Sequence, residues 1–303
     1  MKILYGKGIA QEVQQEIRGE IELLRGPVGQ PPGLAVLLVG EDPASRAYVR
    51  NKQRACEEVG IRSFCDFLPQ DISEELLLRQ ISSLNEDPGI HGILVQLPLP
   101  EHIRESKVIE TISPEKDVDG FHPYNVARLF SSNPTLIPCT PRGILELLDR
   151  NQIELSGQRV VIIGSSYIVG KPLALLLLNR GAFVTLCHKY TRDLAGVARE
   201  GDILVTAVGL RGLVTAEMVK EGAVVIDVGI SFVEGRTVGD VDFEGVARVA
   251  AAVTPVPGGV GPLTVTMLLK NTLLAYKLQH GIGDSVSCLP GTSSPACESR
   301  EAR

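Results

Sequence analysis

The stretch Val160–Pro172 reads VVIIGSSYIVGKP and decides the fold. It opens with an apolar run typical of a buried parallel strand, and a turn bounded by Gly164 and Gly170 follows, ahead of a helix expected at Leu173–Leu178. Such a turn points backbone N–H groups and a helix N-terminus at phosphate. The spacing of the two glycines meets the dinucleotide pattern GxGxxG only in part, so the turn alone fits a ligand-free connection equally well.

Further apolar runs extend this pattern in both directions along the chain. Three follow the turn at Phe183–Leu186, Ile203–Thr206 and Val224–Asp227, and two precede it at Leu34–Val39 and Gly92–Val95. Helical stretches separate the runs, and such alternation implies right-handed parallel crossovers. In an open parallel sheet ligands bind beyond the carboxyl ends of the strands, so we expect the site residues there.

The length of 303 residues favours two domains that share a cleft over one large domain. We expect an α/β fold with an N-terminal α/β domain over residues 1–138 and a dinucleotide-binding domain over residues 139–262. Thr140 is a candidate cap for the helix that connects them. Residues 263–279 form one more amphipathic helix. Residues 281–303 are rich in Ser, Gly, Pro and charge, which predicts a disordered tail.

Composition excludes several classes of protein. The net charge of -6 argues against a nucleic-acid binder, which would need a basic face to displace counterions from phosphates. The six cysteines show neither CxxC pairs nor zinc-ligand spacing, so we expect no metal site and no disulfide framework. The N-terminus has no long apolar segment typical of a signal peptide, and no apolar run reaches membrane-spanning length. These features predict a cytoplasmic protein without a membrane partner.

Candidate catalytic groups occur in the first domain. Tyr48 and Lys52 are one helical turn apart on a helix that Asp42 can cap, so a phenol and an amine project from one face. Gln96 ends a strand, and Asp119 precedes a glycine. Each has an ordinary structural alternative: a solvated lysine, a half-buried tyrosine, a loop hydrogen bond or an Asx turn. The set gains weight only when its members are taken together.

Candidate cofactor groups occur in the second domain. The strand after the glycine turn ends at Cys187, His188 and Lys189, where dinucleotide folds contact the adenosine ribose. An acidic residue there favours NAD, whereas a cation tolerates a 2′-phosphate. The Pro- and Gly-rich loop Thr254–Pro262 is rigid yet allows close backbone approach to a flat ligand, although a domain connector would read similarly.

Five ordered motifs carry a resemblance to a known family. The chain resembles the bifunctional methylenetetrahydrofolate dehydrogenase/methenyltetrahydrofolate cyclohydrolase family from about Leu4 to Gln279. The matching stretches are Pro43–Lys52, Val95–Pro100, Lys116–Phe121, Ile168–Pro172 and Thr254–Pro262.

The resemblance implies a folate cleft between the N-terminal α/β domain and a Rossmann-type domain, with the final helix packed back on the first domain, and a homodimer. It implies that Lys52 is the central cyclohydrolase residue, that Tyr48 and Gln96 position or polarise groups around it, and that Asp119 holds the pterin. Further implied substrate contacts are Leu97, Pro98, Pro257, Gly258 and Gly259. The implied cofactor contacts are Gly164, Ser165, Ser166, Ile168, His188, Lys189, Tyr190, Thr206, Ala207, Val208, Gly209 and Ile230.

The implied chemistry suits these residue types. Hydride leaves a methylene group between two nitrogens whose lone pairs support the developing cation, so the dehydrogenase step needs orientation more than acid or base. Water must then attack the methenyl cation. A lysine that has lost its proton, or one that polarises the water or the leaving amine, can assist, and Lys52 is the family-matched candidate.

The cofactor motif departs from the family at two positions. Ser165 stands where the family usually has Arg, and Lys189 where it often has Ser. We therefore expect NADP as the preferred cofactor by a reduced margin, with NAD as the alternative. Two other functions compete: a monofunctional NAD-dependent methylenetetrahydrofolate dehydrogenase, against which Lys52 speaks, and a catalytically silent folate- or nucleotide-binding protein.

Overall fold

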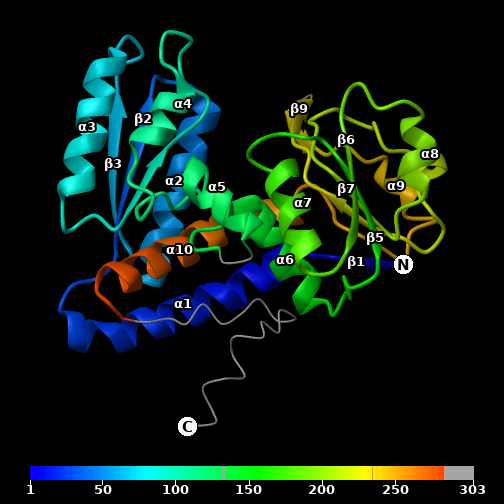
Figure 1. Cartoon of the computed structure of the whole chain (residues 1–303), viewed down its shortest axis with the longest axis horizontal. Coiled ribbons are helices and arrows are strands. Elements are labelled where there is room, and N and C mark those ends of the chain that lie inside the picture. Colours follow the sequence, from blue (N-terminus) through cyan, green and yellow to red (C-terminus); the bar gives the residue numbers. More distant parts are fainter. Residues whose placement is uncertain (132–133, 234, 283–303) are drawn as a thin grey trace.

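Two parallel sheets, one in each half of the molecule, organise the chain (Figure 1). The computed structural model describes residues 1–131, 134–233 and 235–282. The smaller sheet has the strand order β3 (Arg62–Leu68), β2 (Gly33–Val39), β4 (Gly92–Val95). The larger sheet has the order β1 (Lys2–Ile3), β11 (Ala252–Val253), β8 (Val224–Asp227), β7 (Ile203–Thr206), β5 (Arg159–Ile163), β6 (Phe183–Cys187). Every neighbouring pair runs parallel, which confirms the predicted α/β class.

Helices cover both faces of the small sheet, so its central strand β2 is buried throughout. Helix α2 (Pro43–Val59) packs on one set of alternate β2 side chains. Helices α3 (Glu74–Glu86) and α4 (Glu105–Thr111) pack on the other set. A strand buried on both faces reads as a continuous apolar run, which is the pattern seen in the sequence.

Helix α2 has ends that suit its sequence, including the predicted cap Asp42. The Asp42 side chain accepts a hydrogen bond from the Ser45 N–H at 2.7 Å, and Pro43 occupies the first helical position. Gly60 ends the helix in the left-handed conformation with φ 87°. The face of α2 that carries Val49, Cys56 and Val59 is buried in the core.

The second half carries the predicted glycine turn between β5 and helix α7 (Gly170–Asn179). The predicted start at Leu173 is wrong, because Pro172 lies inside the first turn, where its missing N–H costs nothing. The remaining elements are α5 (Pro123–Phe130), α8 (Leu194–Arg199), the 3-10 helix Ala216–Met218, the antiparallel pair β9 (Ser231–Val233) and β10 (Arg236–Val238), and α9 (Phe243–Val246).

Three helices join the halves: α1 (Gly6–Val28), α6 (Cys139–Arg150) and α10 (Val260–Gln279). Figure 1 shows α1 passing beneath both halves with α10 beside it. The start of α10 contributes Leu263 to the core of the second half, and its later turns fill the core under the small sheet. The final helix thus packs on the first half, although it begins earlier than the predicted residue 263 because Pro262 again fits its first turn.

Two expectations about the domain boundaries need correction. Strand β1 pairs with β11 in the large sheet, so the first residues of the chain do not lie with the rest of 1–138. Two residues of strand are too short to be read from periodicity. Thr140 does not cap α6, because that helix already begins after Pro138; its hydroxyl lies 3.1 Å from that of Thr264 on α10.

A buried amide on α10 connects this helix to both halves. Asn271 is fully buried, and its Nδ2 donates hydrogen bonds to the carbonyls of Val118 at 2.7 Å and Ile137 at 2.8 Å. Its Oδ1 accepts a hydrogen bond from Nη1 of Arg142 on α6. The final helix is therefore positioned by directional bonds as well as by apolar packing.

The predicted tail at 281–303 lies, from residue 283 onward, outside the described residues. Within the described part of the chain, no helix has the length and apolar character needed to cross a membrane.

Candidate active site

The predicted amine and phenol of α2 meet in the structure. Lys52 is buried, with only 6% of its surface exposed, and its Nζ lies 4.9 Å from the centroid of the Tyr48 ring. One helical turn separates the two residues, so they share a face of α2. An ammonium over an aromatic face is attracted by the electrons of the ring. The pair therefore places an amine in a defined, largely dry position.

The end of β4 supplies a third group. Gln96 follows the last residue of β4, and its Oε1 accepts a hydrogen bond from Lys52 Nζ at 3.0 Å. Its Nε2 donates to the carbonyl of Leu97 at 2.7 Å, ahead of a cis peptide bond between Leu97 and Pro98. Because both ends of the amide are engaged, the carbonyl oxygen stays directed at the amine.

Asp119 provides a carboxyl group close enough to interact with the same cluster. Burial raises the pKa of Asp119 to about 6, while Lys52 acts to lower it and Asp117 to raise it. Burial, followed by the charge of Asp119, raises the pKa of the Tyr48 phenol. Among the described residues, none forms a hydrogen bond to the Asp119 carboxylate, so its oxygens have acceptor capacity for a ligand.

Asp117 has a structural role instead. Its carboxylate accepts hydrogen bonds from the N–H groups of Phe121 and His122 and from the side chain of Asn125. These bonds hold the turn that carries Asp119. A small pocket beside this turn is lined by Leu97, Asp119 and Phe121, among other residues.

The Pro- and Gly-rich loop lies against the start of α1. The Gly6 N–H donates to the carbonyl of Gly258 at 2.9 Å, and a Cβ added at Gly6 would lie 2.0 Å from the carbonyl oxygen of Gly259. The peptide bond between Val256 and Pro257 is cis. In the described residues no hydrogen bond joins Pro257, Gly258 or Gly259 to Lys52, and their predicted contact with the substrate remains a prediction.

The predicted cofactor residues gather at the carboxyl edge of the large sheet. Strand β5 lies between β6 and β7, so the direction of the connections reverses beside it, where dinucleotides bind in such sheets. A Cβ at Gly164 would lie 2.4 Å from the carbonyl oxygen of Ala207, and a Cβ at Gly170 would lie 1.8 Å from that of Gly164. Neither glycine position has room for a side chain, so the turn exposes backbone to a ligand. A turn of this kind, ahead of a helix, fits the phosphates of a nicotinamide dinucleotide.

Other members of the predicted cofactor set project from the same edge. Ser166, Ile168, Val208, Gly209 and Ile230 are exposed. Thr206, which the sequence predicts as a cofactor contact, is fully buried and instead donates its hydroxyl hydrogen to Asp240.

The loop after β6 presents the predicted cationic group. Lys189 and Tyr190 are exposed, with Nζ of Lys189 5.0 Å from the centroid of the Tyr190 ring. The ring of His188 accepts a hydrogen bond from the Tyr190 N–H at 3.2 Å through Nδ1, and the His188 N–H donates to Thr191 Oγ1 at 2.9 Å. The loop backbone is held locally while the lysine amine stays accessible.

Tyr167 makes a contact that the sequence did not predict. It lies inside the glycine turn, and its hydroxyl donates a hydrogen bond to the carbonyl of Phe121 at 2.9 Å. The cofactor turn is thereby joined to the segment that carries Asp119. The available signal was a tyrosine that follows two serines in the turn, but its partner, the carbonyl of Phe121, could not be predicted from the sequence.

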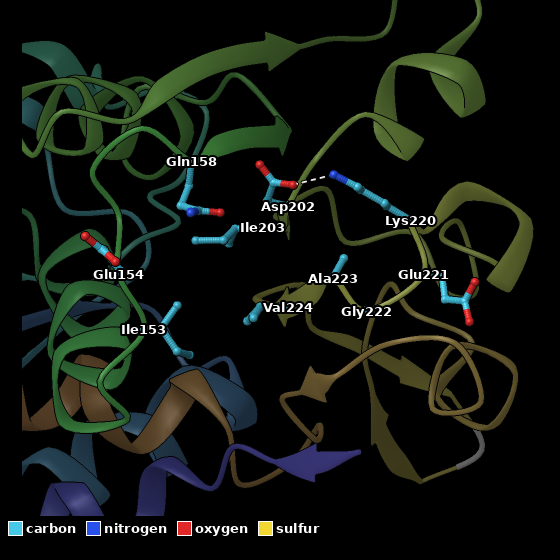
Figure 2. A pocket seen from close by; sticks show the side chains of 10 residues that line it. All are labelled: Ile153, Glu154, Gln158, Asp202, Ile203, Lys220, Glu221, Gly222, Ala223 and Val224. Atoms are coloured by element: carbon cyan, nitrogen blue, oxygen red, sulfur yellow. Dashed lines mark hydrogen bonds and ion pairs between the residues drawn. The ribbon is translucent and has the colours of Figure 1, made fainter.

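A second hollow lies at the opposite end of the large sheet. Figure 2 shows its lining before the amino ends of β5, β7 and β8, with Asp202 and Lys220 joined by an ion pair of 2.5 Å. Both members of this pair are partly exposed, and such pairs contribute little free energy. The hollow contains none of the predicted site residues.

Fold and site together define an α/β enzyme of the nicotinamide-dependent type, in which a dinucleotide-binding sheet accompanies a cluster of amine, phenol, amide and carboxyl groups. The chain belongs to the tetrahydrofolate dehydrogenase/cyclohydrolase family: residues 4–119 match its catalytic domain and residues 138–280 its NAD(P)-binding domain. This confirms the resemblance seen in the motifs.

Individual relatives agree along nearly their whole length. The bifunctional protein FolD of Moorella thermoacetica is 57% identical over 277 residues, which cover 91% of this chain and 99% of that protein. The crystal structure of the bifunctional FolD enzyme from Campylobacter jejuni has a TM-score of 0.90 at 47% identity, covering 92% of this chain and 99% of that one. FolD of Trypanosoma brucei, solved with NADP cofactor and inhibitor, has a TM-score of 0.88 at 43% identity, covering 92% and 98%.

Because the pKa of Asp119 is raised, we expect this residue to contribute less to the free energy of unfolding as the pH rises. An acid whose pKa is raised on folding stabilises the protein below its unfolded pKa, and the contribution is lost as pH rises through the folded value, here about 6. Asp119→Asn should therefore be more stable than wild type at about pH 7.5, by an amount of the order of 1–3 kcal/mol, and the difference should shrink toward about pH 4.5.

Urea unfolding of both proteins across this pH range measures the difference. Asp71→Asn is a matched control, because Asp71 is exposed; its difference from wild type should stay constant. A pH-independent difference for Asp119→Asn would contradict the buried-carboxyl interpretation.

Proposed function

We propose that Tyr48, Lys52, Gln96 and Asp119 form a single folate site that serves both reactions of the family. These reactions are the NADP-dependent oxidation of 5,10-methylenetetrahydrofolate to the 5,10-methenyl form and its hydrolysis to 10-formyltetrahydrofolate. The observation that carries the proposal is the buried Lys52 amine, held between the Tyr48 ring and the Gln96 carbonyl. A buried amine with a fixed acceptor is costly to maintain for packing alone.

In the oxidation, this chain's residues bind and orient the substrate. Asp119 would accept hydrogen bonds from the pterin, for which its carboxylate oxygens have free capacity. Leu97, Pro98, Pro257, Gly258 and Gly259 would form the walls around the ring system. Bound NADP supplies the hydride acceptor, and the two nitrogens beside the methylene carbon stabilise the cation that results. No protein base is needed at this carbon, so orientation is the main contribution of the site.

In the hydrolysis, Lys52 acts on the water that attacks the methenyl carbon. The amine would hold this water, or take part in moving its proton toward the leaving ring nitrogen. Gln96 keeps the amine in place through the hydrogen bond to Nζ, and Tyr48 supports it from the ring face. The C–N bond of the five-membered ring then breaks, which leaves the formyl group on N10.

The cofactor would lie along the carboxyl edge of the large sheet. We propose that the pyrophosphate meets the turn at Gly164, Ser165 and Ser166, ahead of α7. Lys189 would place its ammonium near the adenosine 2′-phosphate. The further proposed contacts are Ile168, His188, Tyr190, Ala207, Val208, Gly209 and Ile230, and a related FolD binds NADP.

We also propose a homodimer formed through the small sheet. Strand β3 is at the edge of this sheet and leaves Phe64 and Phe67 exposed, at 42% and 50%. An exposed edge strand with large apolar side chains favours pairing with a second copy.

A cytoplasmic location is proposed as well, supported by the free thiols of Cys56, Cys65, Cys139 and Cys187.

Lys52→Met should lower the cyclohydrolase rate by about 100-fold or more, while dehydrogenase activity stays measurable, because only hydrolysis requires the amine. The two rates are followed separately by methenyl absorbance, with methylene- or methenyltetrahydrofolate as the substrate. Lys107→Met, at an exposed lysine of α4, is the matched control. Unchanged methenyl hydrolysis in Lys52→Met would sink the assignment.

Lys189→Ala should reduce the preference for NADP over NAD, and Ser165→Arg should increase it. An ammonium attracts a phosphate as a point charge, whereas Arg offers two parallel hydrogen bonds. The wild-type preference should weaken with salt, because Lys189 is exposed. The measurement is kcat/KM with both cofactors, and Lys220→Ala, at the amino end of the sheet, is the control. A wild type that favours NAD and is insensitive to Lys189→Ala would refute this reading.

The double variant Phe64→Glu/Phe67→Glu should be monomeric when the wild type sediments as a dimer, because paired charges on β3 oppose edge-to-edge association. Sedimentation velocity gives the mass directly. Phe183→Glu serves as the control, since Phe183 is 60% exposed on the edge strand of the other sheet. Persistence of the dimer in the double variant would move the interface elsewhere.

A further inference from the structure

We infer that Asp240 is a positioning residue for the nicotinamide cofactor, acting through the loop that follows β7. Asp240 is fully buried. Its Oδ2 accepts hydrogen bonds from Thr206 Oγ1 at 2.9 Å and from the Val208 N–H at 2.8 Å, and its Oδ1 accepts one from the Leu210 N–H at 2.7 Å. One carboxylate therefore accepts hydrogen bonds from the last residue of β7 and from two N–H groups of the loop that follows it.

A second buried carboxylate fixes Asp240 in turn. Asp227 ends β8, and its Oδ1 accepts hydrogen bonds from the N–H groups of Gly229 at 3.1 Å and Asp240 at 3.0 Å. Its Oδ2 accepts from the Val241 N–H at 3.0 Å. Two adjacent buried acids are unfavourable, and burial first, with the charge of Asp240 adding to it, raises the pKa of Asp227 to about 6. A pair of buried carboxylates that is unfavourable for stability points to a function for Asp227 and Asp240 beyond packing.

Two glycines make room for the two carboxylates. A Cβ at Gly229 would lie 2.0 Å from Asp240 Oδ1, and a Cβ at Gly239 would lie 1.9 Å from Asp227 Oδ2. Any side chain at either position would displace a carboxylate. The arrangement is thus built from four positions on two separate segments, which is more than an Asx turn requires.

The loop held by Asp240 lies at the edge where the cofactor is proposed to bind. Ala207 faces Gly164 across the reversal point of the sheet, and Val208 and Leu210 are exposed, at 40% and 56%. From β9, Ser231 Oγ donates a hydrogen bond to the Gly209 carbonyl at 2.9 Å. The loop is therefore fixed on its buried side by Asp240 and at its tip by Ser231, which leaves its outer surface free for a ligand.

This inference rests on the proposed cofactor site, and it separates the two activities. Lys52 and Asp119 belong to the first half of the chain, whereas Asp240 forms its side-chain hydrogen bonds within the second half. Loosening the loop should weaken cofactor binding and misplace the cofactor. Hydrolysis of methenyltetrahydrofolate needs no nicotinamide and should proceed as before.

The test uses Asp240→Asn, which keeps the shape of the side chain but turns one acceptor oxygen into a donor that faces a donor. We expect the KM for NADP and the Kd for NADPH, measured by fluorescence titration, to rise by about 10-fold or more, as the loss of a hydrogen bond to a buried charged group implies. The KM for methylenetetrahydrofolate and the rate of methenyl hydrolysis without nucleotide should stay within about twofold of wild type.

Two further variants keep the test decisive. Asp242→Asn removes a neighbouring carboxylate that caps α9 and does not contact the loop, so the Kd for NADPH should be unchanged. Ser231→Ala removes only the bond to Gly209 and should raise that Kd by about threefold; it replaces Asp240→Asn if the latter does not fold. Unchanged NADPH affinity in Asp240→Asn, or an equal loss of both activities, would overturn the inference. A wild type that binds neither nicotinamide cofactor would instead overturn the proposed function.

Discussion

The arrangement of the two halves of the molecule depends on the hydrogen bonds of the Asn271 side-chain amide. It lies on α10 and bonds simultaneously to the carbonyls of Val118 and Ile137 and to Arg142. Val118 directly precedes Asp119, and Ile137 lies just before the helix that leads into the second half. Without this amide, two buried carbonyls and a guanidinium group would lose partners, and each such loss costs about 1–3 kcal/mol. The carboxyl group at the proposed folate site is thus held from α10.

The groups proposed for folate chemistry and those proposed for cofactor binding are held by different parts of the fold. The amine and its acceptor come from α2 and the end of β4, which pack on a sheet buried on both faces. The proposed cofactor contacts come from loops at the carboxyl edge of the other sheet, stabilised by buried carboxylates. Tyr167 links the two through its bond to Phe121. Because the two supports are built on different sheets, we expect that a substitution in one can perturb its reaction more strongly than the other.

Much of this could be predicted from the sequence, because the relevant signals are local. Apolar runs mark the strands, Asp42 and Gly60 mark the ends of α2, and the one-turn spacing of Tyr48 and Lys52 places them on one face. The errors came from features without a local signal. Prolines inside first turns hid the starts of α7 and α10, and β1 was too short for periodicity to reveal. The bonds of Asp240 to Thr206, Val208 and Leu210 join residues 30 to 34 positions apart and could not be read from spacing.

The crossing of the chain between the two sheets also bears on how the protein is made. Strand β1 completes the edge of the large sheet, and α10 fills the core beneath the small one. During synthesis on the ribosome the small sheet therefore emerges long before the helix that covers it. Its apolar underside stays open to solvent until the last turns of α10 leave the exit tunnel, which is when such surfaces are prone to aggregate.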